Sequence, residues 1–414
     1  MRVILVADHA SIDFGGEAAL PCHYFRVLSA REGIDVHLVV HERSRPFLQR
    51  HFADAGDRIH YARDTAAHRF IFHGFQKHLP DRIGYLTFGF LLRTLTQYQQ
   101  RSIVTGLIVD KANTLVHQVI PVSPKAPSNM SGLGVPVMFG PLNGGMNYPQ
   151  AFSHYEGGLS AKFNQVGRLF SNGLHYLFSG KRLADLILVA NQRTARALPS
   201  CIRGEVKEIV ENGVDLSLWS ASVNTESSAV PAFVYVGRLV DWKAVDILLL
   251  AYFDACRQFG PMVLHIIGDG NERPKLEKMV AAHGDANAEV IFHGWVAQSD
   301  IAPILKGARA LVLPSLYECG GAVVLEAMAS GVAVIATNWG GPADYLDDHC
   351  GILVNPDSRE ALIAGFSQGL MILATNPDMA VAMGSAGRRK IEAEYDWEKK
   401  VDQVTALYHH LLEK

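Results

Sequence analysis

The hydrophobic positions of this chain fall into short runs that are separated by longer amphipathic stretches. In the first half, a helical pattern over 17–31 connects two of these runs, which occupy 2–7, 35–40, 114–120, 135–140 and 186–190. Runs of this length are typical of strands buried on both faces, and the helical stretches between them indicate a parallel sheet covered by helices. The first half is therefore predicted to be an α/β domain.

The second half repeats the same scheme. Its helical stretches cover 244–257, 273–283 and 321–330, and its apolar runs occupy 232–237, 262–268, 289–294, 308–314, 332–337 and 351–354. Between the halves, a polar and serine-rich segment over 220–231 has the composition of a linker. The pattern thus predicts two α/β domains in one chain.

Composition supports a globular enzyme and excludes some other classes. The chain has 414 residues, which is long for a single domain, and 49% of them are hydrophobic and 19% charged. We see no run of 18 apolar residues and no signal-peptide pattern at the start, so neither a spanning helix nor secretion is expected. The five cysteines are scattered without a C-x-x-C pair, which favours reduced thiols in the cytoplasm over a zinc site or a disulfide framework.

Charge is distributed unevenly along the chain. Residues 1–210 hold 23 Lys and Arg against 15 Asp and Glu (+8), and residues 211–414 hold 15 against 26 (−11). A basic first half suits an anionic membrane surface, although a solvated surface of uneven charge gives the same totals. The segment 69–104 interleaves aromatic with basic residues, so it forms either an amphipathic surface for lipid headgroups or a helical pair packed on the sheet. No nucleic-acid partner is expected.

Candidate chemistry gathers in the stretch E-C-G-G-A-V-V-L-E, from Glu318 to Glu326. A strand is predicted to end at about Pro314, and a helix is predicted to begin near Gly321. Ligands bind at the carboxyl ends of strands in open parallel sheets, and glycines before a helix N-terminus favour a phosphate. Glu318 then lies where a carboxylate can accept hydrogen bonds from sugar hydroxyls, and Glu326 where it can bind a ribose diol.

Two cations are predicted to reach the same edge of the sheet. Arg238 directly follows the run 232–237, and Lys243 begins the next helical stretch. Arginine offers a forked contact to phosphate oxygens and lysine a point charge, so together they could neutralise a diphosphate without a metal ion. The chain has no D-x-D or H-E-x-x-H motif, and we expect no metal and no other cofactor.

These motifs follow one another in the order of a known family. The segments VENGVD (210–215), VGRLVDWKAVDILL (236–249), IIGDGNERPKLE (266–277), FHGWV (292–296), PSLYECGGAVVLEAMASGVAVIATNWGG (314–341) and GILV (351–354) resemble the retaining, nucleotide-sugar-dependent glycosyltransferases of family 4, which carry the E-x7-E motif. The first half resembles the family more weakly, through 14–40. The resemblance implies the GT-B fold, an α/β architecture in which two Rossmann-like domains face each other across a cleft and the last helix crosses back. It assigns 1–205 plus 393–414 to an acceptor domain and 206–392 to a donor domain.

The resemblance also implies roles for individual residues. Arg238 and Lys243 would hold the donor diphosphate, Glu326 the ribose, and Glu318 the transferred sugar. The amides of Gly320, Gly321 and Ala322 would lie near the sugar and phosphate, and Gly294, Trp295 and Val296 beside the nucleobase. Gly320 stands where the family usually has Phe, a departure that bears on the shape of the sugar pocket.

In the first half, the resemblance places Gly15 and Gly16 close to the donor phosphate or the acceptor. It matches His117 to a catalytically important histidine near the reacting carbon, beside the catalytic candidates Arg238, Lys243 and Glu318. A lone histidine is otherwise a satisfied core or rim residue. Asn143, Gly144 and Gly145 either line the acceptor side or form a structural turn.

The expected activity is the transfer, with retention, of a hexose from a nucleotide diphosphate sugar such as UDP- or GDP-hexose. The acceptor hydroxyl would belong to a glycan, a lipid-linked molecule or a small molecule, in polysaccharide or glycoconjugate biosynthesis at the inner face of the membrane. A non-catalytic sugar-nucleotide-binding protein, a phosphorylase with bound pyridoxal and an epimerase are the alternatives. A dinucleotide-dependent oxidoreductase is disfavoured because neither glycine-rich turn completes G-x-G-x-x-G.

Overall fold

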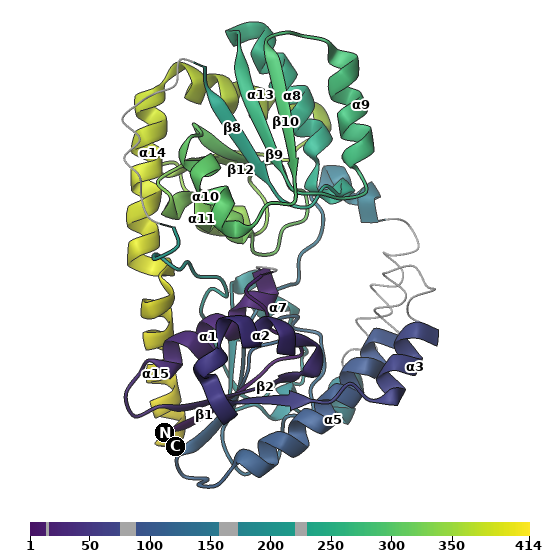
Figure 1. The fold of residues 1–414 in the computed structure, drawn as a ribbon, viewed down its shortest axis with the longest axis vertical. Helices are drawn as coiled ribbons and strands as arrows, with labels where there is room; N and C mark the ends of the chain where they lie inside the picture. The colour runs from purple at the N-terminus through teal and green to yellow at the C-terminus, as the bar shows by residue number, and fades with distance from the viewer. Residues whose placement is uncertain (14–15, 75–87, 157–172, 220–229) are drawn as a thin grey trace. The chain divides into compact units, whose positions relative to one another are not determined.

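The computed structural model describes the whole chain except residues 14–15, 75–87, 157–172 and 220–229 (Figure 1). Contacts divide the chain into two compact units. The first unit comprises residues 1–145, 163–211 and 400–414, and the second comprises 146–162 and 212–399. The fold is thus two α/β units, each with its own parallel sheet, as the sequence predicts.

Parallel strands form the core of the first unit. The order across its sheet is β3-β2-β1-β4-β5-β6-β7. The strands are β1 (Arg2–Val6), β2 (Asp35–His41), β3 (Ile59–Ala62), β4 (Thr114–Gln118), β5 (Val137–Leu142), β6 (Leu186–Val189) and β7 (Glu205–Glu208). β1 and β4 are neighbours although two strands lie between them in the sequence, so the strand order reverses there and creates a switch point.

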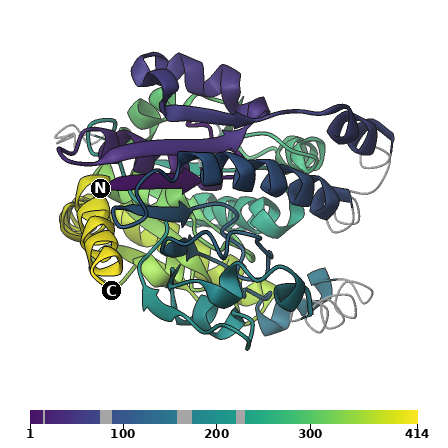
Figure 2. The ribbon, with the colours of Figure 1, turned by 90° about the horizontal axis from the view of Figure 1, so that it is seen from below.

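Helices cover both faces of this sheet. They include α1 (Leu20–Ser29), α2 (Arg45–His51), α3 (Ala66–Gly74), α5 (Phe90–Leu107), α7 (Gln192–Ala197) and the end of α15 (Trp397–Leu412). α5 packs on β1, β2 and β3, and the side chain of its Gln100 donates a hydrogen bond of 2.7 Å to the Ala7 carbonyl. Both chain termini belong to this unit, where α15 runs beside the sheet (Figure 2).

The second unit is built on a sheet with the order β10-β9-β8-β11-β12-β13. Its strands are β8 (Ala232–Val236), β9 (Met262–Ile267), β10 (Ala288–Gly294), β11 (Ala310–Leu313), β12 (Ala333–Thr337) and β13 (Gly351–Val354). Its helices are α8 (Val245–Phe259), α9 (Arg273–His283), α10 (Gln298–Lys306), α11 (Ala322–Ala329), α12 (Gly341–Tyr345), α13 (Arg359–Thr375) and α14 (Pro377–Lys390). The switch point of this sheet lies between β8 and β11.

The division into units departs from the expected boundaries in three places. The first unit continues to Glu211 rather than 205, because β7 pairs with β6 at its edge. Residues 146–162 group with the second unit, although they follow β5 of the first. The chain returns to the first unit at Lys400, within α15, rather than at 393. The last helix does cross back, as predicted, and the linker segment 220–231 lies almost wholly outside the described residues.

Two strands were missing from the sequence prediction. β3 has only four residues, of which His60 and Tyr61 are polar or amphipathic, and β7 reads Glu-Val-Lys-Glu and is mostly exposed. Both lie at the edges of the sheet, where a strand needs no continuous hydrophobic run. Within the described part of the chain, none of the helices combines the length and the hydrophobicity needed to span a bilayer.

Candidate functional site

The proposed donor residues follow the two strands that flank the switch point of the second sheet. β8 ends at Val236 and is followed by Arg238, and the short 3-10 helix Asp241–Lys243 carries Lys243. β11 ends at Leu313 and leads into the loop that holds Glu318. The Leu316 amide donates a hydrogen bond of 2.9 Å to the Trp242 carbonyl, which ties the two loops together. The residues that the sequence predicted to share one edge therefore do so.

Lys243 and Glu318 form an ion pair at this edge. The lysine ammonium group donates a hydrogen bond to a carboxylate oxygen of Glu318, and the two side chains are only 13% and 16% exposed. Arg238 is exposed, and its guanidinium carbon lies 5.6 Å from the centre of the Trp242 ring. The edge thus offers one exposed cation and one that is held by a carboxylate.

Glycines let the backbone pass closely beneath Glu318. The Gly341 amide donates a hydrogen bond of 2.8 Å to the Glu318 carbonyl. A Cβ atom on Gly341 would lie 1.9 Å from the Gly320 carbonyl oxygen, so only glycine fits there. Gly321 has φ +78° and precedes the first residue of α11, Ala322, with no side-chain cap. The first amides of α11 have no partner within the helix, which is the arrangement that binds anions.

Glu326 lies on α11, half-buried and beside α10. Gln298, the first residue of α10, donates a hydrogen bond of 2.8 Å to its carboxylate. Burial raises the pKa of Glu326 to about 7, although the bond from Gln298 works in the opposite direction. The carboxylate is therefore neither in a dry apolar core nor fully solvated.

Gly294, Trp295 and Val296, the residues proposed to lie beside the nucleobase, connect the end of β10 to α10. The Gly294 carbonyl accepts a hydrogen bond of 2.7 Å from the Gly268 amide, and its φ of +70° turns the chain out of the strand. Trp295 is 72% exposed and Val296 is half-buried. Only two residues lie between Trp295 and Gln298, so this segment and Glu326 are linked through one short turn.

His117 does not have the position that the resemblance implied. It lies inside β4, between Leu5 of β1 and Met138 of β5, and is fully buried. Its Nε2 is 2.6 Å from the Gly140 carbonyl, which only accepts, so Nε2 carries the proton and Nδ1 accepts from the Tyr408 hydroxyl at 2.6 Å. Burial lowers the pKa of His117 to about 4. Both ring nitrogens are occupied, and the histidine joins β4 to α15 rather than reaching a substrate.

The N-G-G turn after β5 is a packing element. The Asn143 side chain is buried and donates a hydrogen bond to the carboxylate of Glu211. A Cβ on Gly144 would lie 2.7 Å from Pro124, and one on Gly145 would lie 2.5 Å from the Ala197 Cβ. Of the two readings left open by the sequence, these contacts favour the structural turn.

The remaining glycine pair of the first half is only partly described. Gly15 lies outside the described residues. Gly16 begins the short 3-10 helix Gly16–Ala19 with φ +53° and is exposed. Its role near a phosphate or an acceptor remains a prediction.

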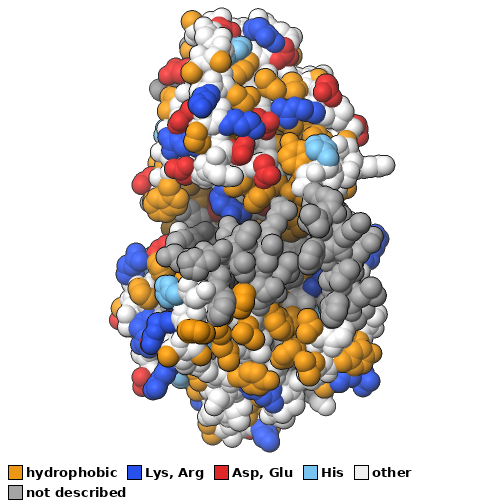
Figure 3. Space-filling model, turned by 90° about the vertical axis from the view of Figure 1, so that its right-hand side faces the viewer, with side chains coloured by type: hydrophobic (Ala, Val, Ile, Leu, Met, Phe, Trp, Pro, Cys, Tyr) orange, Lys and Arg blue, Asp and Glu red, His pale blue; other side chains and the backbone are white. Residues whose placement is uncertain are grey.

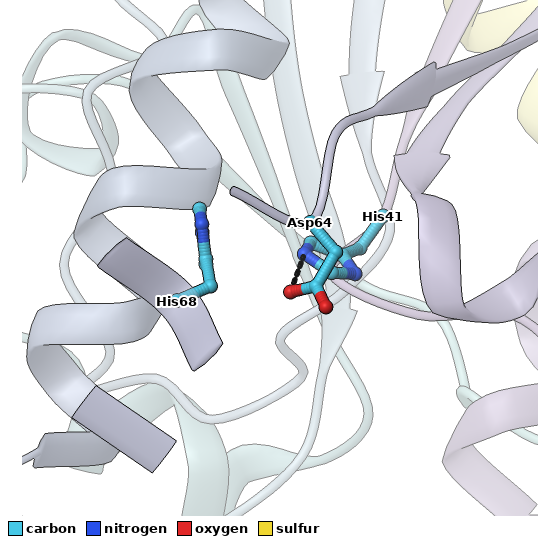
Figure 4. A group of neighbouring side chains, drawn as sticks. All are labelled: His41, Asp64 and His68. Atoms are coloured by element: carbon cyan, nitrogen blue, oxygen red, sulfur yellow. Dashed lines mark ion pairs between the residues drawn. The ribbon is translucent and has the colours of Figure 1, made fainter. Parts of the chain in front are cut away.

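A His-Asp-His group lies at the carboxyl ends of β2 and β3, beside α3 (Figure 4). Nitrogen or oxygen atoms of His41, Asp64 and His68 all lie within 4.8 Å of one another. The Arg43 guanidinium is 3.0 Å from the Asp64 carboxylate, and the Arg43 amide donates to Nδ1 of His41. Nδ1 of His68 is 2.7 Å from the Thr65 hydroxyl. These hydrogen bonds occupy Nδ1 of both imidazoles and one Asp64 oxygen, whereas Nε2 of His41 faces the Asp64 carboxylate at 3.9 Å.

The comparisons with known proteins agree with this geometry. Residues 222–390 match the family model described as glycosyl transferases group 1. This part of the chain is a group 1 glycosyl transferase domain. Its relatives include alpha-maltose-1-phosphate synthase of Mycolicibacterium smegmatis, which is 30% identical over 221 residues that make up 48% of this chain and 56% of the relative. Glycogen synthase of Mycobacterium tuberculosis is 26% identical over 201 residues, 48% of this chain and 47% of that protein.

Solved structures show the fold over the full chain. Sucrose-phosphate synthase of Thermosynechococcus elongatus aligns with a TM-score of 0.67 at 18% identity, over 100% of this chain and 99% of the other. HepE of Anabaena in complex with UDP aligns with a TM-score of 0.66 at 16% identity, over 99% and 100%. The fold is GT-B, as predicted. The matches to the curated relatives, by contrast, span about half of their length, so they concern mainly the group 1 domain.

Some residues around the site were not singled out from the sequence. Gln298 contacts Glu326, and Tyr317 and Trp339 lie on the two loops that meet at Glu318. Their partners are distant in the sequence, so no spacing pattern identifies them. The aromatic residues in the loops after β11 and β12 were the only available indication.

Proposed function

We propose that this protein is a retaining glycosyltransferase that moves a hexose from a nucleotide diphosphate sugar to a hydroxyl group. The observation that carries the proposal is the meeting of Lys243, Glu318 and the uncapped start of α11 at the switch point of the second sheet. A cation and free helix amides suit a diphosphate, and a carboxylate beside them suits sugar hydroxyls. The group 1 domain supports the same reading.

The reaction needs stabilisation of the leaving group more than an added nucleophile. The bond from the anomeric carbon to the phosphate oxygen breaks, and its electron pair stays on the diphosphate. The acceptor oxygen bonds to the same face of that carbon and passes its proton to the departing phosphate. Lys243, Arg238 and the start of α11 would stabilise the negative charge that develops, an effect typically worth about 2.7–4 kcal/mol for each well-placed donor.

The donor is a UDP- or GDP-hexose in this proposal. Crystals of HepE contain UDP-glucose, and a relative from Corynebacterium glutamicum, 27% identical over 53% of this chain and 61% of that protein, is named as a GDP-mannose-dependent mannosyltransferase. The binding site would place the base beside Trp295, the ribose at Glu326 and the hexose at Glu318. The acceptor would be a glycan or a lipid-linked molecule.

A thermal-shift screen against UDP-glucose, GDP-mannose and their diphosphates tests the proposal. A ligand at 100 times its dissociation constant adds about 2.7 kcal/mol to the free energy of unfolding, which raises the melting temperature by a few degrees. NMR of the anomeric proton should show that the transferred sugar has the same anomeric configuration in the product as in the donor. Binding without any transfer or hydrolysis would favour a non-catalytic binder, and absorption by pyridoxal would favour a phosphorylase.

Lipid contact through 69–104 is a further part of this proposal. Residues 75–87 of the segment lie outside the described residues. The rest falls mainly in α5, which packs on the sheet, and in α3, which packs on α5. Phe70 of α3 is 67% exposed and Tyr98 of α5 is 58% exposed. Hydrophobic side chains also gather on the face of the first unit that Figure 3 shows. A protein working at the cytoplasmic membrane face should float with anionic vesicles at low salt and less at high salt. No flotation at either salt would favour a soluble acceptor.

A further inference from the structure

Residues 146–156 form a strap on the group 1 domain. They follow the N-G-G turn after β5 of the first unit, yet they group with the second unit. The strap ends in the 3-10 helix Gln150–Glu156, and its Met146 and Phe152 are buried. A segment from the first half of the chain is therefore a structural part of the proposed donor domain.

The strap touches both loops that hold the backbone of Glu318. The ring of Tyr148 lies 5.2 Å from the ring of Tyr317, the residue just before Glu318. The indole N–H of Trp339 donates a hydrogen bond of 2.9 Å to the Asn147 carbonyl. A Cβ on Gly340, the next residue, would lie 2.3 Å from the Glu318 carbonyl oxygen and 2.5 Å from the Met146 side chain.

The far end of the strap reaches the third loop of the site. The ring of Tyr155 stacks near Tyr148, with 6.0 Å between the ring centres. Tyr155 also lines a small pocket of about 140 Å³ together with Val240 and Asp241, which lie on the same loop as Lys243. The strap thus contacts the loops that follow β11 and β12 and shares a pocket with the loop that follows β8. Glu318 lies on the loop after β11, and Lys243 on the loop after β8.

We propose that the strap is a working part of the donor site, in which Tyr148 is a positioning residue that fixes Glu318 through Tyr317. This inference rests on the proposed function. Aromatic pairs add about 0.5–1.5 kcal/mol beyond their buried area, enough to select one arrangement of a short loop. A carboxylate displaced by about 1 Å can cost a factor of roughly 100 in rate, so a contact behind it affects turnover without touching substrate.

The inference separates two properties of the site. In the proposed function, the nucleoside diphosphate is held by Arg238, Lys243 and Glu326, and only the transferred sugar requires Glu318. Loss of the Tyr148 ring should therefore leave the affinity for UDP or GDP within about twofold. Turnover of the donor should fall roughly 10- to 100-fold, because Glu318 is no longer fixed. A purely structural role would change both quantities, or only the melting temperature.

The test compares Tyr148→Ala, Tyr148→Phe and the exposed strap variant Gln150→Ala with the wild type. Isothermal titration with UDP and GDP gives the affinities, and steady-state hydrolysis or transfer with UDP-glucose and GDP-mannose gives kcat and KM. We expect Tyr148→Phe and Gln150→Ala to match the wild type, since the first keeps the ring and the second lies outside the contact. Trp339→Phe keeps an aromatic ring but loses the hydrogen bond to the strap, so it should also lower kcat. This variant provides the test if Tyr148→Ala does not fold.

The outcomes separate the inference from the function on which it rests. An active wild type whose kcat is unchanged in both Tyr148→Ala and Trp339→Phe would overturn the role of the strap and leave the proposed function intact. Equal loss of UDP affinity and of turnover in the folded variants would also overturn it, in favour of a structural role. A wild type that binds and turns over none of these nucleotide sugars would overturn both.

Discussion

Gln298, the first residue of α10, donates a hydrogen bond of 2.8 Å to the carboxylate of Glu326 on α11. Burial raises the pKa of this carboxyl group to about 7, so its charge changes near neutral pH. A ribose diol donates two hydrogen bonds, which the ionised form accepts best. Glu326 is therefore the group most directly connected to the pH dependence of donor binding.

Affinity for UDP-glucose should rise with pH, by up to roughly 10-fold between pH 6 and pH 8, as Glu326 loses its proton. UDP-glucose is the right probe because its diphosphate diester does not titrate in this range. Titration calorimetry at several pH values measures the effect. Glu326→Gln should bind more weakly at pH 8 and show a nearly flat profile, whereas the exposed control Glu289→Gln should follow the wild type.

The same carboxyl group should make stability depend on pH in the absence of ligand. Its folded pKa lies above the value of 4.5 for an unperturbed glutamate, so the folded state keeps this proton longer than the unfolded state. The resulting contribution favours folding below about pH 4.5 and is lost as the pH rises through 7. Melting curves of wild type and Glu326→Gln should therefore diverge in favour of the variant as the pH rises from 5 to 8; parallel curves would contradict the shift.

Lys243→Ala should lower kcat by about 100- to 1000-fold, as expected for the loss of one donor to a developing oxyanion. Affinity for the intact donor should change much less, because the leaving group gains its extra charge only in the transition state. Single-turnover assays with saturating donor measure the chemical step. Lys278→Ala, which removes an exposed lysine from α9, is the matched control. An unchanged rate in Lys243→Ala would remove the assignment.

Gly341→Ala should disturb the donor loop while leaving the rest of the sheet in place. The new Cβ would lie 1.9 Å from the Gly320 carbonyl oxygen, a backbone atom that moves only with the loop. We expect turnover to fall at least 10-fold and the melting temperature by several degrees. Gly307→Ala is the control, because its nearest neighbouring atom would be 3.6 Å away. Full activity of Gly341→Ala would mean that the loop can relax freely.

His117→Phe should affect stability rather than chemistry. It removes the hydrogen bonds to the Gly140 carbonyl and the Tyr408 hydroxyl, and leaving such buried groups unsatisfied costs about 1–3 kcal/mol. Since the folded pKa of His117 is about 4, below its usual value, wild-type stability should also fall as the pH drops from 6.5 towards 4, and less so in the variant. Denaturant titrations at pH 5 and 7 test both statements. A large loss of kcat in a well-folded variant would restore a catalytic role.

Activity should persist in excess chelator, because Arg238, Lys243 and the start of α11 supply the positive charge that a diphosphate needs. The measurement is turnover of UDP-glucose or GDP-mannose after dialysis against EDTA. Complete loss that returns on adding Mg²⁺ or Mn²⁺ would show that a cation shares this task.

The sequence was most informative where a local pattern determines the structure. The run 232–237, its glycine and Arg238 predict a strand end at a sheet edge, and the same holds for 308–314 before Glu318. Parallel strands align their carboxyl ends, so pairing of β8 with β11 brings the two loops together without further information. The edge strands β3 and β7 were missed because exposure on an edge removes the continuous hydrophobic run.

Side-chain orientation and distant contacts could not be predicted in this way. The resemblance implied that His117 lies near the reacting carbon, but its ring is hydrogen-bonded to Tyr408 of α15, a residue almost 300 positions later in the chain. The pairing of Tyr148 with Tyr317 likewise joins residues from different halves. No spacing rule records such contacts, because they depend on how complete elements pack.

The position of α15 has a consequence for biosynthesis. Its Tyr408 completes the core beside His117, yet the ribosome makes it only after the entire second unit. The first unit can therefore complete its core only after the whole second unit and α15 have been synthesised.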